Sequence, residues 1–268
     1  AAIIFSDILM LPYGLNQKVE FKKNFGPILG ELNVKELLEI DEINFVKKVN
    51  PVYKLLNLVK NNDLTKNKST IGFVGAPWTL LVYMINKQSP KIKLKDNFFD
   101  DQNLINQILK VLEKFLKIHI KNQIDNGAEI IQIFDSWANL LNEKDLPNYV
   151  YNPTLNLVEY IKSLNVPVIC FPKGIKKYKE FCEIVKPSAI CIDYDVNPSQ
   201  ILKDINIPVQ GGMDPKVLLS DKNNLKIQIN RYLNIFKDHP YIFNLGHGIL
   251  PETDPNMMDY MVKTVKDF

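Results

Sequence analysis

Four polar residues of different chemistry lie at or just after short apolar runs of the sequence. Asp7 ends AAIIFSD, Ser136 ends EIIQIFDS and His247 ends YIFNLGH, whereas Tyr83 lies shortly after TIGFVGA. A carboxylate, a hydroxyl, an imidazole and a phenol can all hydrogen-bond a polar substrate, and an ionised carboxylate can stabilise a cation. These side chains are candidates for one site if the fold brings them together.

Each candidate also has an ordinary structural explanation. Asp7 could cap a helix that begins in residues 8–11, and this alternative weighs as much as a functional role. Ser136 lies outside any GxSxG elbow, so hydrogen bonding or capping is favoured over nucleophilic attack. The segment before Tyr83, GFVGAPWT, matches neither GxGxxG nor a Walker loop, and alone it predicts a packed strand–helix corner. His247 is favoured as functional because its flanking glycines leave the imidazole accessible.

The three cysteines support neither a disulfide framework nor a metal site. Cys170, Cys182 and Cys191 make an odd number, form no CxxC pair and have no histidine beside them. Zinc sites need three or four converging ligands, so small buried side chains are the simpler interpretation. Free thiols are typical of a reducing compartment.

Short apolar runs alternate with amphipathic helical patterns, which is typical of right-handed βαβ units and a parallel sheet. The segment 17–30 fits neither pattern and is predicted to be a hairpin or a loop insertion. The predicted strands are residues 1–7, 70–76, 129–136, 167–173, 189–195, 208–214 and 241–247. The predicted helices are residues 101–126, 152–164, 176–185, 198–205, 225–236 and 255–265, with two more in 33–59 that split near Pro51.

Polar residues at the end of every predicted strand favour a TIM-type (β/α)8 barrel over an open sheet, because a barrel brings all strand ends to one face. The pattern contains seven strand–helix units, and the chain begins inside the first strand. We therefore expect residues 1–268 to form a single barrel domain that lacks its first strand–helix unit. The strand-end residues are Asp7, the Gly75 turn, Ser136, Lys173, Asp193 with Asp195, Asp214 and His247.

Composition excludes several classes of protein. The 268 residues are 46% apolar and 24% charged, which suits one globular core and excludes a disulfide mini-protein. The net charge of +3, carried by lysines and the single arginine Arg231, is too small to predict nucleic-acid binding. No apolar run reaches the roughly 18 residues of a membrane span, and the start does not resemble a signal peptide. We expect a cytoplasmic protein without nucleic-acid or membrane partners.

Five segments, in order along the chain, resemble blocks of the uroporphyrinogen decarboxylase family: AAIIFSDIL, IGFVGAPWTLLVYM, FDSWA, PVQGGMDP and NLGHGILPETDP. The resemblance implies a (β/α)8 barrel, usually homodimeric, that uses no metal or organic cofactor. Members remove the carboxyl groups of the four acetate side chains of uroporphyrinogen III, giving coproporphyrinogen III and CO2. It places the substrate-contacting residues at Asp7, Tyr83, Ser136 and His247, with Asp7 as the catalytic carboxylate.

The chemistry agrees with this resemblance. A pyrrole ring protonated on carbon can accept the electron pair that remains when CO2 leaves. Asp7 could accept hydrogen bonds from the pyrrole N–H groups and stabilise the cationic ring. The family's RQAGRY-like motif, whose arginines are expected to bind carboxylates, is absent before FSDIL, and Arg231 matches no family site. We therefore expect residues 1–268 alone to be inactive or nearly so. Two alternatives are a zinc-dependent corrinoid or coenzyme M methyltransferase, although VICFPKG lacks the His-x-Cys pair, and a non-catalytic tetrapyrrole-binding protein.

Overall fold

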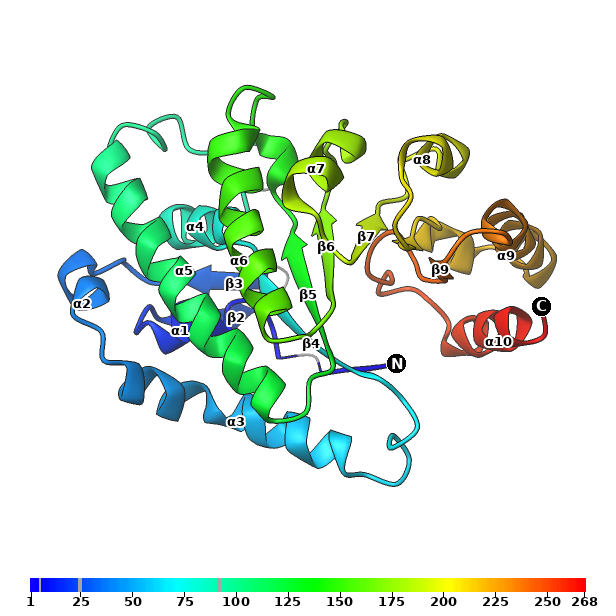
Figure 1. The fold of residues 1–268 in the computed structure, drawn as a ribbon, viewed down its shortest axis with the longest axis horizontal. Coiled ribbons are helices and arrows are strands. Elements are labelled where there is room, and N and C mark those ends of the chain that lie inside the picture. The colour runs from blue at the N-terminus through cyan, green and yellow to red at the C-terminus, as the bar shows by residue number, and fades with distance from the viewer. Residues whose placement is uncertain (5, 24–25, 91–92) are drawn as a thin grey trace.

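The main sheet of the computed structural model contains seven parallel strands in the order β1-β4-β5-β6-β7-β8-β9, which is also their order along the chain (Figure 1). The structure describes residues 1–4, 6–23, 26–90 and 93–268. Each predicted strand is confirmed in shorter form, although residue 5 of the first lies outside the described residues. The strands are β1 (Ala2–Ile3), β4 (Thr70–Gly75), β5 (Ile130–Asp135), β6 (Val168–Pro172), β7 (Ala189–Ile192), β8 (Val209–Gly211) and β9 (Tyr241–Ile242).

Helices cover the outer face of this curled sheet, and each helix from α5 to α10 contacts the next one along the chain (Figure 1). Between them run the short helical turns η1 (Ala138–Leu140), η2 (Pro147–Tyr151) and η3 (Pro215–Leu219). The α-helices are α1 (Met10–Gly14), α2 (Val34–Leu38), α3 (Glu42–Lys60), α4 (Pro77–Asn86), α5 (Gln102–Asp125), α6 (Asn152–Ser163), α7 (Tyr178–Val185), α8 (Pro198–Asp204), α9 (Lys222–Phe236) and α10 (Pro255–Lys266).

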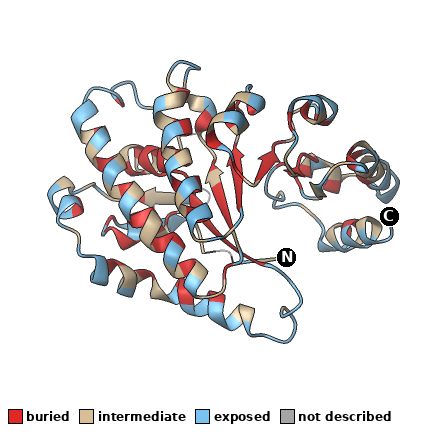
Figure 2. Cartoon of the chain, viewed as in Figure 1, coloured by how far each residue is buried: buried red, intermediate tan, exposed pale blue. Residues whose placement is uncertain are grey.

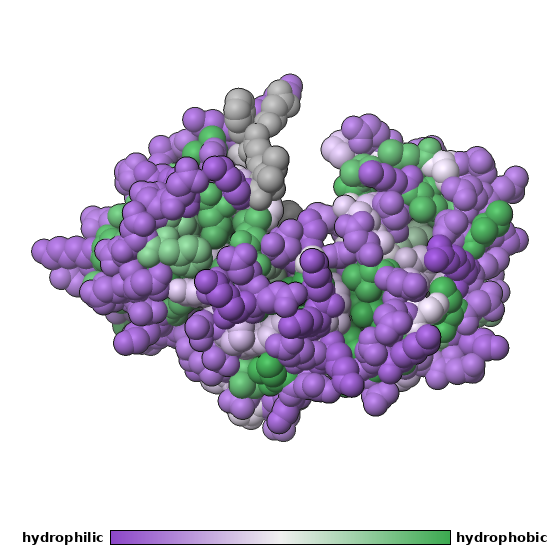
Figure 3. Space-filling model, turned by 90° about the horizontal axis from the view of Figure 1, so that it is seen from above, coloured by the Kyte–Doolittle hydropathy of each residue, from purple (hydrophilic) through white to green (hydrophobic). Residues whose placement is uncertain are grey.

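The sheet has the strand order and helix arrangement of a TIM-type barrel, but it is open. Strands β1 and β9 form its two edges, and no strand ladder joins them within the described residues. Seen from above in Figure 3, the molecular surface is notched between two lobes. The predicted fold class is therefore confirmed, as an incompletely closed, seven-stranded barrel.

Buried side chains form two layers. The larger layer lies between the strands and the helices, where Trp78, Phe45 and Phe115 have almost no exposed surface (Figure 2). A smaller cluster on the strands, separate from the first, contains Ile169 and Phe171 of β6 together with residues of β7. This is the inner layer expected of a barrel interior.

The predicted break of the helix near Pro51 is wrong. Helix α3 runs without interruption from Glu42 to Lys60, and the break in this region lies between α2 and α3. Proline removes one helical hydrogen bond, but Pro51 faces solvent while Val49 and Val52 beside it are buried. Packing on both sides of the proline therefore outweighs its local cost.

The segment 17–30 forms the predicted hairpin. Strands β2 (Val19–Lys22) and β3 (Gly26–Leu29) pair antiparallel, while residues 24–25 between them lie outside the described residues. Gln17 anchors the hairpin to the barrel, because its buried amide donates hydrogen bonds to Gly30 O and Met84 O, each at 3.0 Å. The hairpin is thus an insertion attached to the end of α4.

Candidate active site at the carboxyl ends of the strands

The polar residues predicted to end the strands lie on the loops immediately beyond them. Ser136 follows β5, Lys173 follows β6 and Asp193 follows β7 directly, whereas Asp7 and His247 lie a few residues beyond β1 and β9. Since the strands are parallel, all these loops lie at the same end of the sheet. The structure therefore places these residues at one end of the sheet, as the strand-end pattern in the sequence predicted.

Alternation of side chains along the strands directs three of these residues inward. Phe134 of β5 and Phe171 of β6 belong to the inner layer, with ring centroids 6.2 Å apart. Successive side chains of a strand point to opposite faces, so Ser136 and Lys173 continue the inward series. Asp193 holds the same position after β7. By this alternation we infer that Ser136, Lys173 and Asp193 form a polar layer above the apolar one.

Asp7 holds the turn before α1 and keeps one oxygen available. Its φ of 68° is in the left-handed region that aspartate tolerates. Its Oδ1 accepts a hydrogen bond from Leu9 N at 2.8 Å, and its Oδ2 bonds to no other described residue. Leu9, rather than Asp7, is the N-cap of α1. The capping alternative is thus half correct, because the carboxylate supports the turn but does not cap the helix.

Asp7 and Tyr83 are electrostatically coupled. Burial raises the pKa of Asp7, and the hydrogen bond from Leu9 N opposes this shift. Burial also raises the pKa of Tyr83, and the negative charge of Asp7 raises it further. Tyr83 therefore remains a phenol that can donate a hydrogen bond. Its ring packs edge-on against Trp137, with centroids 6.1 Å apart, which brings the loop after β5 beside it.

A buried network anchors the loop that carries Ser136. Thr79 Oγ1 donates to Asp135 Oδ1 at 2.6 Å and accepts from Trp137 N at 3.2 Å. Trp78 Nε1 donates to Trp137 O at 2.8 Å. Ser136 itself is half-buried and forms no hydrogen bond to another described residue. Asp135 and Thr79 thus tie the loop after β5 to α4.

Asp135 should make the stability of the fold depend on pH. Burial raises its pKa from 3.8 to about 7, so between these values the folded state holds a proton that the unfolded state has lost. The free energy of unfolding should therefore fall as pH rises through this window, by at most about 1.4 kcal/mol per pH unit. Asp135→Asn carries no charge to bury, and its denaturant unfolding should lack this decline. Equal pH dependence in both proteins would contradict the assignment.

His247 follows β9, the edge strand at the other end of the strand order from β1 and Asp7, and lies within electrostatic range of Lys173 and Asp193. Partial burial of the imidazole lowers its pKa, the charge of Lys173 lowers it further, and Asp193 opposes both. Gly248 N donates to His247 Nδ1 at 2.6 Å, so the neutral ring carries its proton on Nε2. The imidazole is therefore a neutral donor at neutral pH.

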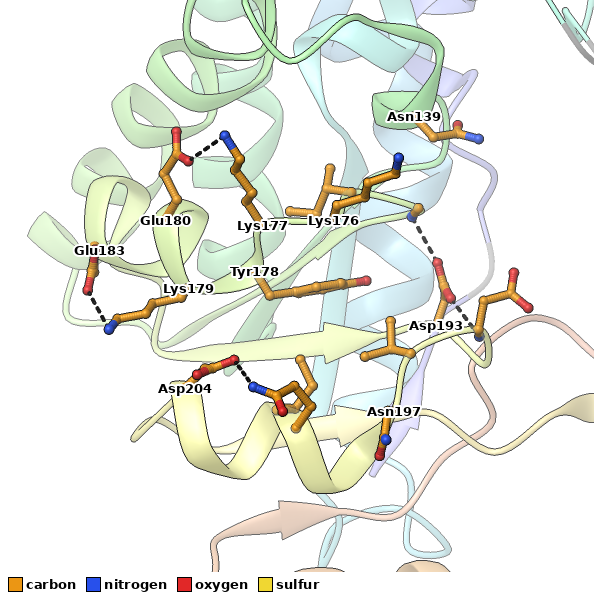
Figure 4. Close-up of a pocket in the computed structure, with 16 residues that line it drawn as sticks. Asn139, Lys176, Lys177, Tyr178, Lys179, Glu180, Glu183, Asp193, Asn197 and Asp204 are labelled. Carbon is orange, nitrogen blue, oxygen red and sulfur yellow. Dashed lines mark hydrogen bonds and ion pairs between the residues drawn. The ribbon is translucent and has the colours of Figure 1, made fainter.

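Asp193 joins the loops around His247. Its Oδ2 accepts from Gly174 N at 2.8 Å and its Oδ1 accepts from Asp195 N at 2.9 Å (Figure 4). Gly246 presses against the same loop, because a Cβ at this position would lie 2.4 Å from Tyr194 N. Sequence reasoning identified Asp193 only as a strand-end residue, and it missed both contacts.

A cavity of about 960 Å³ opens between α7 and α8, beside these loops (Figure 4). Two of its three lysines form ion pairs, Lys177 with Glu143 at 2.9 Å and Lys179 with Glu183 at 3.9 Å. None of the four predicted site residues lines this cavity. Asp7 lies near Tyr83, and His247 lies near Lys173. Among the described residues, no hydrogen bond or ion pair connects the first pair to the second.

No group of three or more His, Cys, Asp or Glu side chains in the described part of the chain is arranged to hold a metal ion. Cys170 and Cys191 are buried, Cys182 is half-buried, and all are free. No helix in residues 1–4, 6–23, 26–90 and 93–268 combines the length and apolar character needed to cross a bilayer.

Comparison with known proteins gives a match over the whole chain. A family model described as "Uroporphyrinogen decarboxylase (URO-D)" matches residues 1–268. The curated uroporphyrinogen decarboxylase of Rickettsia bellii is 38% identical over 276 residues, covering 100% of this chain and 80% of that protein. That of Rickettsia felis is 36% identical over 273 residues, covering 99% and 78%. A solved methyltransferase from Methanosarcina mazei, 13% identical, superposes with a TM-score of 0.76 over 100% of this chain and 80% of its own, which supports the fold alone.

Proposed function

The chain belongs to the uroporphyrinogen decarboxylase family, and on that premise we propose that it is a carboxy-lyase acting on uroporphyrinogen III. It removes the carboxyl groups of the four acetate side chains and releases coproporphyrinogen III and CO2. The observation that carries this proposal is the match across residues 1–268 to curated relatives of that name. No observation favours the methyltransferase or the non-catalytic binding protein.

Each decarboxylation consumes one proton and needs a place for an electron pair. Protonation of a pyrrole carbon makes the ring cationic, and cleavage of the bond to CO2 then returns the electron pair to the ring. Protonation of the resulting methylene carbon and loss of the ring proton leave a methyl group. The charge that develops and disappears lies on the ring, so a fixed negative group beside the ring lowers the barrier.

Asp7 is suited to be that negative group. Its Oδ1 is held by Leu9 N, while Oδ2 is free to accept N–H donors of the macrocycle. Burial raises the pKa of Asp7 in the free protein, but hydrogen bonds from the pyrroles and the nearby cationic ring would favour its ionised form. The carboxylate thus binds the centre of the macrocycle and stabilises the cation.

The carboxylate side chains of the substrate are bound or positioned by Tyr83, Ser136 and His247. The phenol of Tyr83 and the imidazole Nε2–H of His247 are neutral donors, and the hydroxyl of Ser136 has no described partner. Each can donate to a carboxylate without bringing a competing negative charge.

We also infer that the protein forms a homodimer, which light scattering would test. We infer a cytoplasmic location as well, because free thiols suit a reducing compartment.

The full gene product, incubated without oxygen with chemically reduced uroporphyrinogen III, should release CO2 and form coproporphyrinogen III. Liquid chromatography of the oxidised products separates the intermediates by their number of carboxyl groups. Oxidised uroporphyrin is the matched control, because its aromatic ring cannot accept the first proton in this way. Tight binding of the macrocycle without CO2 release would contradict the proposal and indicate a non-catalytic binding protein.

A further inference from the structure

Positive charge is scarce at the end of the sheet where a polycarboxylate would bind. The residues that immediately follow β5, β6 and β7 are Ser136, Lys173 and Asp193, and of these only Lys173 is a cation. The single arginine, Arg231, is an exposed residue of α9, a helix of the outer layer. A substrate with many carboxylates would make a lysine at this position significant.

The backbone around Lys173 fixes where its side chain points. Lys173 N donates to Asp135 O at 3.0 Å, so the β5–β6 ladder extends one residue beyond β6. Alternation from Phe171 then directs Lys173 inward, beside Ser136. The side chain therefore belongs to the polar layer above the aromatic rings.

The ammonium group of Lys173 has no ion-pair partner among the described residues, although the residue is half-buried. Lys177, four residues further on, pairs with Glu143 and Glu180. The nearby carboxylate of Asp193 uses both oxygens on backbone N–H groups. A partly desolvated cation without a counter-charge is poised to bind an anion.

Lys173 and His247 act on the same region of the site. The charge of Lys173 contributes to the lowered pKa of His247, so the two groups lie within electrostatic reach of each other. An anion bound between them would receive a charged donor and a neutral donor, as carboxylates often do in proteins.

We propose that Lys173 binds a side-chain carboxylate of the macrocycle that does not react, and so orients the ring against His247. The proposal deepens the decarboxylase function and rests on it. The bound carboxylate is inferred to be one that does not react. An ammonium group paired with the reacting carboxylate would stabilise the ground state, and it would lose its partner when that carboxylate leaves as neutral CO2. Such an interaction would raise the barrier rather than lower it.

Lys173→Gln should raise KM for uroporphyrinogen III by about tenfold to a hundredfold, the usual value of a charge-assisted hydrogen bond, and should change kcat little. Lys173→Arg should recover part of the affinity. The matched control is Lys176→Gln, which removes the same charge from an exposed residue of the same loop. Fluorescence titration should show an equal loss of affinity for uroporphyrin, which keeps the acetate carboxyls, and coproporphyrin, which lacks them.

Labelling of the three histidines allows the pKa of His247 to be followed by NMR in the ligand-free protein, where Lys173→Gln should raise it. A loss of affinity for uroporphyrin alone would overturn the proposal, because the arm would then be a reacting acetate. Unchanged affinity for both porphyrins would also overturn it, whatever the pKa of His247 does. If the wild-type protein binds porphyrins but releases no CO2, the decarboxylase function fails while the two affinity losses still report on Lys173.

Discussion

Replacing Asp7 by asparagine should lower kcat for uroporphyrinogen III by about a hundredfold to a thousandfold, the usual effect of removing one preorganised electrostatic group. The loss follows because the ring becomes cationic on the path to CO2 release, and Asp7 Oδ2 is the free carboxylate oxygen before α1. An asparagine amide would present N–H groups to the pyrrole N–H donors and would provide no negative charge. Turnover by the full gene product is the measurement.

Asparagine is a clean replacement at this position. It tolerates the φ of 68° as well as aspartate does, and its side-chain oxygen can still accept from Leu9 N, so the turn should survive. Asp41→Asn is the matched control, because Asp41 also accepts a backbone N–H, as the N-cap of α3. An unchanged kcat in Asp7→Asn would remove Asp7 from the proposed role.

The pH dependence of kcat/KM gives an independent sign of the same group. The proposed role requires ionised Asp7, so activity should fall as pH falls through the pKa of Asp7. Burial raises that pKa, and the acid limb should therefore begin above the range of an ordinary carboxyl. In Asp7→Asn the residual activity should lack this limb.

Much of the fold could be predicted from the sequence because its strands are buried on both faces. β4 and β6 consist entirely of buried residues, and each appears in the sequence as a short apolar run. The break near Pro51 was predicted wrongly because a local rule about proline does not register the buried residues on both sides of it. Long-range packing decided that helix.

The site could be predicted only in outline. The strand-end pattern predicted that Asp7, Ser136 and His247 lie beyond the carboxyl ends of the strands, and the structure places them there. That they form a functional site stays a prediction, as do their individual roles. The hydrogen bond from Gly174 N to Asp193 joins segments 19 residues apart, and the close approach of Gly246 to Tyr194 joins segments about fifty residues apart. Periodicity and local motifs do not encode either contact. Both are contacts of tertiary structure.

Gly246→Ala should be the second variant with a large effect, through the position of His247. An added Cβ would lie 2.4 Å from Tyr194 N and 2.8 Å from Asp193 C, and these are backbone atoms that cannot rotate away. Gly246 N also donates to Met213 O at 2.8 Å, which holds the glycine from the other side. The loop after β7 and the loop with His247 must therefore separate.

A displacement of a catalytic or binding group by about 1 Å can lower turnover about a hundredfold. We therefore expect kcat/KM of Gly246→Ala to fall by about a hundredfold. Its free energy of unfolding should fall by about 1–3 kcal/mol. Gly248→Ala is the matched control, because its added Cβ meets no atom within 4 Å and its main-chain N–H to His247 remains. That variant should stay within about twofold of the wild type, as exposed substitutions usually do. A melting curve shows whether Gly246→Ala is folded at the assay temperature. A folded Gly246→Ala protein with wild-type kcat/KM would mean that catalysis does not depend on where the loops hold His247.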